Sequence, residues 1–362
     1  MVQPAERPLR IADFDLALVL SGGAALGAYQ AGVYQALDEA GLRPGHVAGS
    51  SIGAVNGALI AGNPPEARLD RLRRFWAMAA EPVAGAPPGV GGLLARTQGR
   101  LAALRARLAG RPGLFSPQPL AAAVPWPPFR RPGLNDLTPL LATLRALVAA
   151  PGLAMAGTRL TAQATDLATG RPVRFDSRDG PLDPLQIRAS TSLLPDFDPV
   201  EIDGRLLCDG GFSENLPLRA VLDGMPARPL LMVAVDLMAS ERSPRWSLDG
   251  MADRQQDLHF ASQTRALLAA VTAELELAAA LRPAKAVPVV IAHLVYRGRE
   301  AAGAQKAYDY SAQAVAARWD AGRQDGQAML AGLRAARAPA TPGVTVHRLP
   351  PAPADAAVEL AA

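Results

Sequence analysis

The sequence predicts an α/β fold built around a mostly parallel sheet. Largely apolar runs occur at residues 15–20, 230–235 and 287–295, and such runs are typical of parallel strands that are buried on both faces. Near the N-terminus, a strand, a glycine-rich turn and a helix follow one another twice, as they do in open α/β sheets. Hydrophobic residues make up 49% of the 362 residues and charged residues 19%, which predicts a globular chain with a large core.

The first strand-turn-helix unit begins with the apolar run at 15–20 and continues into Ser21-Gly22-Gly23-Ala24. From Leu26 the apolar residues have helical spacing, and the helix is expected to end at Gly41. The amides of Gly22, Gly23 and Ala24 would then lie at a helix N-terminus, where they could bind a developing negative charge. A nucleotide-binding loop is the alternative, but its G-x-G-x-x-G pattern requires glycine at the position of Ala24.

The second unit has a predicted strand at 47–49, followed by Gly49-x-Ser51-x-Gly53 and a helix. This spacing puts a serine on a sharp strand-to-helix turn and lifts its hydroxyl clear of the sheet, so Ser51 is the candidate nucleophile. The pattern alone is weak because short Gly/Ser patterns also arise by chance. A plain Gly/Ser loop between two elements is the alternative interpretation.

Further along the chain, hairpins are predicted at 160–175 and at 199–208, the second closed by Asp203-Gly204. Asp209-Gly210-Gly211 follows directly, so Asp209 stands where a strand ends and the backbone becomes permissive. A turn-capping role is the alternative for this aspartate. A short helix is expected from Asp183.

A serine hydroxyl needs a positioned base, which is most often a histidine. Only His46 precedes the strand that leads to Ser51, and the other three histidines lack a glycine-rich or strand-end context; they are His259, His293 and His347. A Ser, acid, His order that uses His259 or His293 remains an alternative. Asp209 could act as the base only if burial or close coupling to Ser51 raised its pKa.

Taken in order, these blocks resemble the patatin-like phospholipases. The resemblance rests on the Gly22 loop, the Ser51 motif and Asp209-Gly210-Gly211, and it covers roughly residues 15–235; it extends to Ala189-Ser190-Thr191-Ser192-Leu193-Leu194-Pro195 and Asn215-Leu216-Pro217. Residues 308–319 are similar to the C-terminal extension of one bacterial subgroup. Three blocks in order are far more specific than any one of them.

The resemblance implies a three-layer α/β/α fold and a serine-aspartate dyad in place of a triad. Ser51 would be the nucleophile, Asp209 the base, and the amides of Gly22, Gly23 and Ala24 the oxyanion hole; Gly49, Gly53, Gly210 and Gly211 support the motifs. No metal and no cofactor is implied. Ala24 departs from the family pattern, which has a third glycine there, and a positive φ would strain an alanine by about 1 kcal/mol or more. Leu26 stands where the family often has a basic residue.

The expected organisation starts with an N-terminal arm at 1–14 and a patatin-like catalytic domain at 15–240. Residues 82–139, which are rich in Gly, Pro and Arg, form a cap-like insertion. Its leucines at 94, 101, 104 and 108 predict either a surface helix packed on the core or a helix that faces lipid. A helical C-terminal extension at 241–338 is expected to pack on the core, with long helices at 265–281 and 311–336. A loosely held tail at 339–362 follows.

Composition limits the expected cellular compartment and the expected classes of binding partner. Cys208 is the sole cysteine, which excludes an intrachain disulfide and a cysteine-cluster metal site and favours a reducing compartment. The net charge is only +4, and the sequence contains no run of basic and aromatic residues, so nucleic acid is not an expected partner. The uncharged stretch at 16–37 contains four glycines and two glutamines, which argues against a membrane span. We expect a soluble cytoplasmic protein with peripheral contact to anionic membranes.

The sequence therefore predicts a serine hydrolase of lipid or other acyl esters that works through an acyl-enzyme on Ser51. The first alternative, suggested by Ala24, is a catalytically weak lipid-binding or regulatory protein that keeps the same fold. A nucleotide-binding module that uses the first glycine loop is the second.

Overall fold

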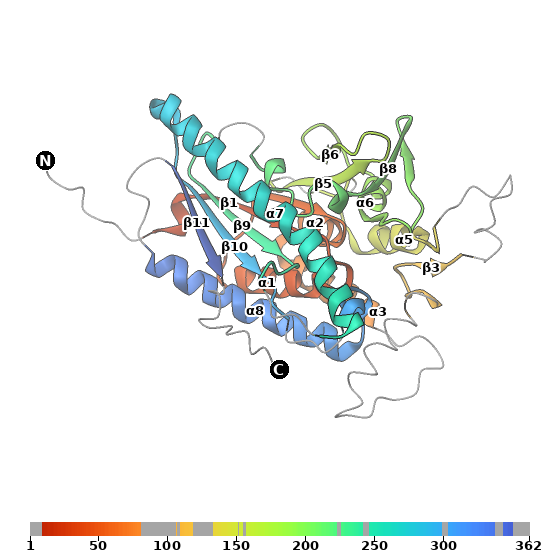
Figure 1. Ribbon diagram of the computed structural model, residues 1–362. Coiled ribbons are helices and arrows are strands. Elements are labelled where there is room, and N and C mark those ends of the chain that lie inside the picture. The colour runs from red at the N-terminus through yellow and green to blue at the C-terminus, as the bar shows by residue number, and fades with distance from the viewer. Residues whose placement is uncertain are drawn as a thin grey trace, which may run out of the picture.

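The computed structural model describes residues 9–80, 106, 109–118, 133–150, 152–154, 157–222, 226–241, 246–298, 303–336 and 343–349. Within these ranges a large mixed sheet is flanked by helices on both faces (Figure 1). The predicted α/β fold with three layers is confirmed.

The large sheet contains nine strands among the described residues, in the order β11-β10-β9-β1-β2-β5-β8-β7, with β6 paired to β5. The strands are β1 (Asp15–Leu20), β2 (His46–Ser50), β5 (Arg159–Asp166), β6 (Pro172–Asp176), β7 (Val200–Ile202), β8 (Arg205–Asp209), β9 (Leu230–Asp236), β10 (Val289–Val295) and β11 (Val344–Leu349). From β11 to β5 all neighbours are parallel, whereas β6, β7 and β8 pair antiparallel. A separate ribbon joins β3 (Ser116–Pro117) to β4 (Asn135–Asp136).

The helices are α1 (Ala28–Glu39), α2 (Ile52–Ala61), α3 (Pro65–Ala80), α5 (Thr138–Leu147), α6 (Pro184–Thr191), α7 (Leu248–Leu281) and α8 (Ala312–Ala335). Alternate residues of the central strands divide the apolar core. Leu18 and Leu20 of β1 face a cluster that includes α1, α2, α3 and α8, and Val19 faces a cluster that includes α7. This alternation is what a sheet buried on both faces requires.

Local signals set several helix ends. The predicted short helix after Asp183 is α6, where the Asp183 side chain accepts a hydrogen bond from the Leu185 amide and the Gln186 side chain accepts one from the Asp183 amide. The Ser247 side chain caps α7. Helix α7 begins 17 residues before the predicted 265, because polar residues along its first half obscure the apolar stripe. No helix in the described part of the chain combines the length and apolar character needed to cross a bilayer.

The C-terminal third of the chain is built into the sheet. Strand β10 pairs with β9, and β11 pairs with β10 at the edge, so strands from the predicted catalytic domain and from the chain after residue 240 share one sheet. Residues 344–349 were expected within a loosely held tail and instead form β11. The short apolar alternation of Val344 and Val346 is too brief to distinguish an edge strand from a coil by sequence alone.

The cap-like insertion at 82–139 falls largely outside the described residues. Its described parts are residues 106, 109–118 and 133–139, which include the β3-β4 ribbon. The leucine stripe at 94, 101, 104 and 108 lies outside them, and its proposed contact with lipid stays a prediction.

Helices α1 and α8 pack backbone against backbone (Figure 1). A Cβ atom built on Gly322 of α8 would lie 2.0 Å from the Tyr29 carbonyl oxygen, and one on Gly32 of α1 would lie 2.0 Å from the Trp319 carbonyl oxygen. Real Cβ contacts are never that short, so each position requires glycine for close approach. Around this crossing, the Trp319 indole donates to Gln35 Oε1 at 2.6 Å.

We expect Gly322→Ala to lower the free energy of unfolding by about 3 kcal/mol, because the added methyl group would push two helix backbones apart. Gly332→Ala on the same helix is the matched control, since nothing lies within 4 Å of a Cβ there. The control should gain up to about 1 kcal/mol from the higher helix propensity of alanine. Urea unfolding midpoints measure both, and equal midpoints for the two variants would contradict the packing argument.

Candidate active site

Ser51 lies on the turn between β2 and α2 in a conformation that L-residues rarely adopt, with φ 54° and ψ −126°. Close packing of Gly49 and Gly53 against the neighbouring backbone keeps Ser51 in this strained conformation. A Cβ on Gly53 would lie 2.2 Å from the Leu20 carbonyl oxygen, and one on Gly49 would lie 2.3 Å from the Gly53 carbonyl carbon. Strained backbone of this kind persists only where the surroundings enforce it, and it is concentrated at functional sites. The predicted sharp strand-to-helix turn is confirmed.

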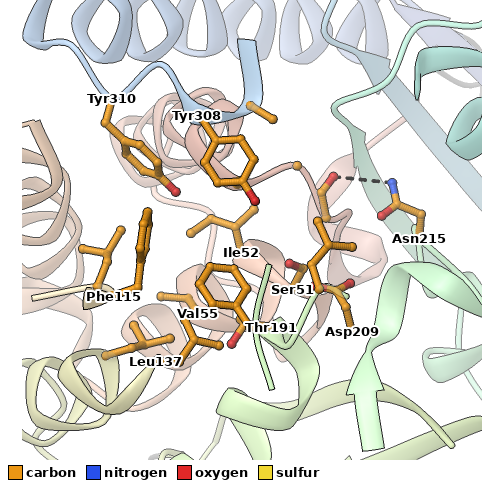
Figure 2. Close-up of a pocket in the computed structure, with 18 of the residues that line it drawn as sticks. Ser51, Ile52, Val55, Phe115, Leu137, Thr191, Asp209, Asn215, Tyr308 and Tyr310 are labelled. Atoms are coloured by element: carbon orange, nitrogen blue, oxygen red, sulfur yellow. Dashed lines mark hydrogen bonds between the residues drawn. The ribbon is translucent and has the colours of Figure 1, made fainter. Parts of the chain in front are cut away.

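Neighbouring polar groups fix the turn. The Ser51 amide donates to Ser190 Oγ at 3.0 Å, and Ser190 in turn donates to the Gln163 carbonyl oxygen. On the other side, the Ser50 hydroxyl donates to the Glu214 carbonyl oxygen at 2.9 Å. These contacts hold the backbone and leave the Ser51 hydroxyl facing the cavity (Figure 2).

Asp209 is the last residue of β8, and β5 brings it to Ser51. Ser50 pairs with Gln163 on one edge of β5, and Asp209 pairs with the next residue, Ala164, on the other edge. The two candidate residues therefore reach the same end of the sheet from the two sides of one strand. Figure 2 shows Ser51 and Asp209 side by side at the wall of the cavity.

Asp209 is 3% exposed. Its Oδ1 accepts the Gly211 amide at 2.8 Å, and its Oδ2 makes no hydrogen bond of standard geometry with the described residues. Burial raises the pKa of Asp209 to about 6, and interactions with the Ser51 hydroxyl and the Gly211 amide limit the rise. A carboxyl group with this pKa is ionised near neutral pH and is basic enough to accept a proton.

The glycine-rich loop after β1 lies next to Ser51, but its three amides differ. The Gly22 amide donates to the Asn215 carbonyl oxygen at 3.1 Å, while Asn215 Nδ2 donates to the Gly22 carbonyl oxygen at 3.4 Å (Figure 2). The Gly22 amide is therefore occupied, contrary to the expectation that it points outward. The amides of Gly23 and Ala24 make no hydrogen bond within the described structure.

Ala24 adopts φ 48° at the start of the short 3₁₀ helix η2 (Ala24–Gly27). The positive φ that the sequence raised as a source of strain is therefore present. Left-handed backbone costs an alanine about 1 kcal/mol relative to glycine.

The cavity beside Ser51 is predominantly apolar (Figure 2). Its apolar lining comes from Ile52, Val55, Phe75, Leu114, Phe115, Leu137, Leu140, Leu193, Phe197, Met238, Phe260 and Ala307. Asp209 is the only charged residue among those that line it in the described structure. Such a cavity suits an apolar chain whose reactive end reaches Ser51.

One wall of the cavity comes from the C-terminal extension, in which the sequence indicated no chemistry. Gln256 and Phe260 of α7 contribute to it, as do Tyr308 and Tyr310 around the end of η7 (Gly303–Tyr308). The Tyr310 ring is covered by the Arg111 guanidinium, which lies 5.5 Å from the ring centroid. Burial raises the pKa of Tyr310 to about 12, so its hydroxyl stays neutral.

Buried polar contacts hold this wall in place. The Tyr308 hydroxyl donates to Asp196, which lies in the loop after α6. Lys306 pairs with Asp253 of α7 at 2.9 Å. Arg318 of α8 is fully buried and donates to three carbonyl oxygens, those of Ala25 at 3.1 Å, Lys306 at 3.0 Å and Asp309 at 2.7 Å. The glycine-rich loop, η7 and α8 thus meet at one guanidinium.

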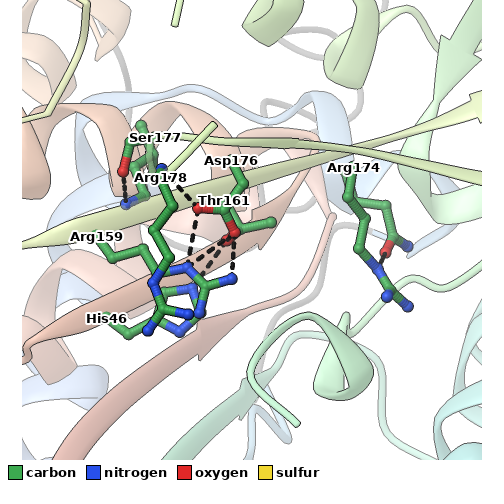
Figure 3. Close-up of polar contacts among 9 residues, drawn as sticks. His46, Arg159, Thr161, Arg174, Asp176, Ser177 and Arg178 are labelled. Carbon is green, nitrogen blue, oxygen red and sulfur yellow. Dashed lines mark hydrogen bonds and ion pairs between the residues drawn. The ribbon is translucent and has the colours of Figure 1, made fainter. Parts of the chain in front are cut away.

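None of the four histidines, all of which lie in described ranges, lines the cavity of Ser51. His46 is the first residue of β2, at the opposite end of that strand from Ser51, and its Nε2 lies 2.8 Å from Thr161 Oγ1 (Figure 3). Burial lowers the pKa of His46 to about 3. His259 is exposed on α7, and His293 lies in a separate cavity. The Ser, acid, His alternative is wrong for this structure.

Comparison of the sequence with family models decides the family. A model described as patatin-like phospholipase matches residues 18–222, more than half of the 362 residues, and a second, described as patatin phospholipase, matches residues 245–341. The chain belongs to the patatin-like phospholipase family. The first match contains the glycine-rich loop, Ser51 and Asp209, and the second contains Tyr308 and Tyr310 of the cavity wall.

Curated relatives include uncharacterized NTE family proteins of Mycobacterium tuberculosis and Mycobacterium bovis. Each is 34% identical over 244 residues, which make up 67% of this chain and 55% of the relative. The chain thus spans about half the length of the curated relatives that it matches. Similar solved structures are VipD from Legionella pneumophila, with TM-score 0.41, 14% identity and coverage of 92% of this chain and 71% of VipD, and the type III effector ExoU, with TM-score 0.38, 17% identity and coverage of 92% and 55%.

Proposed function

We propose that this patatin-like chain hydrolyses carboxylic ester bonds of lipids, with Ser51 as nucleophile and Asp209 as base. The observation that carries the proposal is the meeting of a serine on a strained turn and a buried aspartate at the wall of one apolar cavity. Family membership supports the reaction class.

In the proposed reaction, Asp209 accepts the proton of the Ser51 hydroxyl while Oγ attacks the ester carbonyl carbon. The carbonyl π electrons move onto oxygen, and the amides of Gly23 and Ala24 stabilise the oxyanion. Collapse of the tetrahedral intermediate breaks the bond to the alcohol, which takes the proton from Asp209. A water molecule then attacks the acyl-enzyme while Asp209 accepts its proton. Collapse of the second tetrahedral intermediate breaks the bond to Ser51 Oγ, which takes the proton back from Asp209 as the acid leaves.

The lining of the cavity supports an acyl chain as the part of the substrate that enters it. A phosphate or sugar would leave its polar groups against phenylalanine and leucine side chains, which costs free energy. Long acyl esters should therefore be hydrolysed with a higher kcat/KM than short ones, because the chain buries apolar surface as it binds.

A fluorophosphonate probe tests the proposal directly, because it reacts with activated serines. We expect stoichiometric labelling of the wild-type protein at Ser51 and hydrolysis of a series of short and long acyl esters. Labelling at another serine, or the absence of both labelling and hydrolysis, would favour the alternative of a lipid-binding or regulatory patatin-like protein. The strained alanine at position 24 is the specific observation behind that alternative.

Ala24→Gly should raise the free energy of unfolding by about 1 kcal/mol and should preserve or increase kcat/KM, because glycine adopts φ 48° without strain. Ala28→Gly is the matched control, since Ala28 has helical φ −58° and glycine there should destabilise by about 1 kcal/mol. Chemical unfolding and ester hydrolysis measure both effects. A large loss of activity in a folded Ala24→Gly variant would contradict a role for this loop at the oxyanion.

A further inference from the structure

A second cavity lies at the carboxyl ends of β9 and β10, on the face of the sheet that α7 covers. Its walls come from the loop after β9, from α7 and from the ends of β10 and β11. Met238 lines both this cavity and the one beside Ser51, so the loop after β9 separates the two. The carboxyl ends of parallel strands in open α/β sheets are where such folds bind ligands.

Three residues that line this cavity carry buried polar atoms without hydrogen bonds, and one of them, Arg297, also lines a small neighbouring cavity. His293 is 8% exposed and Thr264 is 2% exposed. Neither ring nitrogen of His293, nor Thr264 Oγ1, nor Nε and Nη1 of Arg297 makes a hydrogen bond within the described structure. Thr264 Oγ1, the two Arg297 nitrogens and at least one ring nitrogen of His293 are donors. Buried donors without acceptors are costly, and several of them at one cavity indicate a place for a ligand rich in acceptors.

The cationic groups around the cavity come from three different elements. Arg265 on α7 and Arg348 on β11 are exposed at the rim, and Arg297 follows β10 with its guanidinium partly buried. Guanidinium groups combine fixed positive charge with several donors and match the geometry of phosphate oxygens.

Two carboxylates also line the cavity, and both are engaged. Asp236 Oδ1 accepts the Met238 amide at 3.0 Å, and Oδ2 lies 3.5 Å from His293 Nε2. Glu241 lies 3.9 Å from the Nη2 of Arg297 and is largely exposed. The three arginines therefore outnumber the two carboxylates, and the unpaired donors of the lining residues remain available for an anion.

From this cluster of buried donors among three arginines, we infer that the cavity at the ends of β9 and β10 binds a phosphate group. Two sources of that group fit the chemistry, inorganic phosphate or a soluble phosphate ester on one hand and the headgroup of an anionic lipid on the other. The site shares a wall with the Ser51 cavity but needs none of its chemistry. Binding can therefore be measured whether or not Ser51 is the nucleophile.

Isothermal titration of the full chain with inorganic phosphate tests the site, with chloride keeping the ionic strength constant. We expect saturable binding of one phosphate per chain. Arg297→Gln should weaken the affinity tenfold or more, since it removes a partly buried charged donor. Arg265→Gln should weaken it at least threefold, and because that side chain is exposed, the variant should fold even if Arg297→Gln does not.

Arg73→Gln on α3 is the matched control, because it removes the same charge from an exposed position remote from the cavity lining. Its affinity for phosphate should equal that of the wild type. If Arg73→Gln weakened binding as much as Arg265→Gln, the effect would be one of net charge and the site would be refuted. Absence of saturable binding at millimolar phosphate, together with no arginine-dependent lipid binding, would refute it as well.

Vesicle sedimentation distinguishes the two sources. Vesicles of phosphatidylcholine with added phosphatidic acid are compared with phosphatidylcholine alone, using the Ser51→Ala variant so that hydrolysis cannot change the lipid. The lipid headgroup would be supported as the source if sedimentation rises with the phosphatidic acid content and is weaker for the double variant that carries Arg265→Gln in addition to Ser51→Ala. Saturable phosphate binding without such sedimentation would support a soluble phosphate compound.

Discussion

Replacing Ser51 by alanine is expected to lower kcat/KM for ester hydrolysis by several orders of magnitude while the protein stays folded. Loss of a catalytic nucleophile leaves only the contribution of substrate binding and oxyanion stabilisation. Alanine can occupy the strained turn at the same cost as serine, because the strain is enforced by Gly49 and Gly53 and not by the hydroxyl. Initial rates with a short and a long acyl ester, together with thermal unfolding, measure the two parts of this prediction.

Ser50→Ala is the matched control for that experiment. The Ser50 hydroxyl donates to the Glu214 carbonyl oxygen, so its loss should cost about 1 kcal/mol of stability. The kcat/KM for hydrolysis should nevertheless remain within about tenfold of the wild type, because a free-energy change of about 1 kcal/mol corresponds to less than a factor of ten. If Ser51→Ala retained wild-type turnover, or if Ser50→Ala lost as much as Ser51→Ala, the nucleophile would have to be another residue.

Asp209→Asn should lower ester hydrolysis about as much as Ser51→Ala, because an amide cannot accept the serine proton. In the wild type, kcat/KM should fall as the pH drops through about 6, where the carboxyl becomes protonated, and should level off above it. His259→Ala and His293→Ala should keep most of the activity, since neither side chain lines the Ser51 cavity. A loss at either histidine equal to that at Asp209 would restore the triad hypothesis.

Asp209→Asn should also stabilise the folded protein near neutral pH. Burial raises the pKa of Asp209 from 3.8 to about 6, so the folded state binds a proton more readily than the unfolded state between these values. Stability therefore falls as the pH rises from about 4 to 6, and at pH 7 the charge costs about 3 kcal/mol. Asparagine carries no such charge. The Asp209→Asn variant should unfold at a higher temperature than the wild type at pH 7 and at a similar temperature near pH 4.

The residues with local signatures could be predicted from sequence. Ser51 and Asp209 each sit beside glycines that the backbone requires, and the apolar runs identified the central strands because such runs report burial on both faces. The parallel pairing of β1 with β2 followed from the two strand-turn-helix units, whereas β5 was predicted only as one strand of a hairpin.

Features that depend on contacts between residues far apart in the sequence could not be predicted from local patterns. The Gly22 amide is occupied by a residue 193 positions away, Asn215, and no local pattern reveals such a partner. Tyr308 and Tyr310 reach the cavity because η7 is tied to Asp196 and to α7. Strand β11 is short and half exposed, so its pairing with β10 depends on the strand already in place.

The order of strands in the sheet has a consequence for how the chain emerges from the ribosome. Strand β1, completed at Leu20, acquires its neighbour β9 only after residue 236 has been made, and Arg318, which binds the Ala25 carbonyl oxygen, appears later still. Long-range parallel pairing is slow, and until it forms, the apolar faces of β1 and β2 stay exposed. A ribosome that stops at residue 240 would therefore release a nascent chain that contains Ser51 and Asp209 but lacks the cavity wall to which Phe260, Tyr308 and Tyr310 contribute.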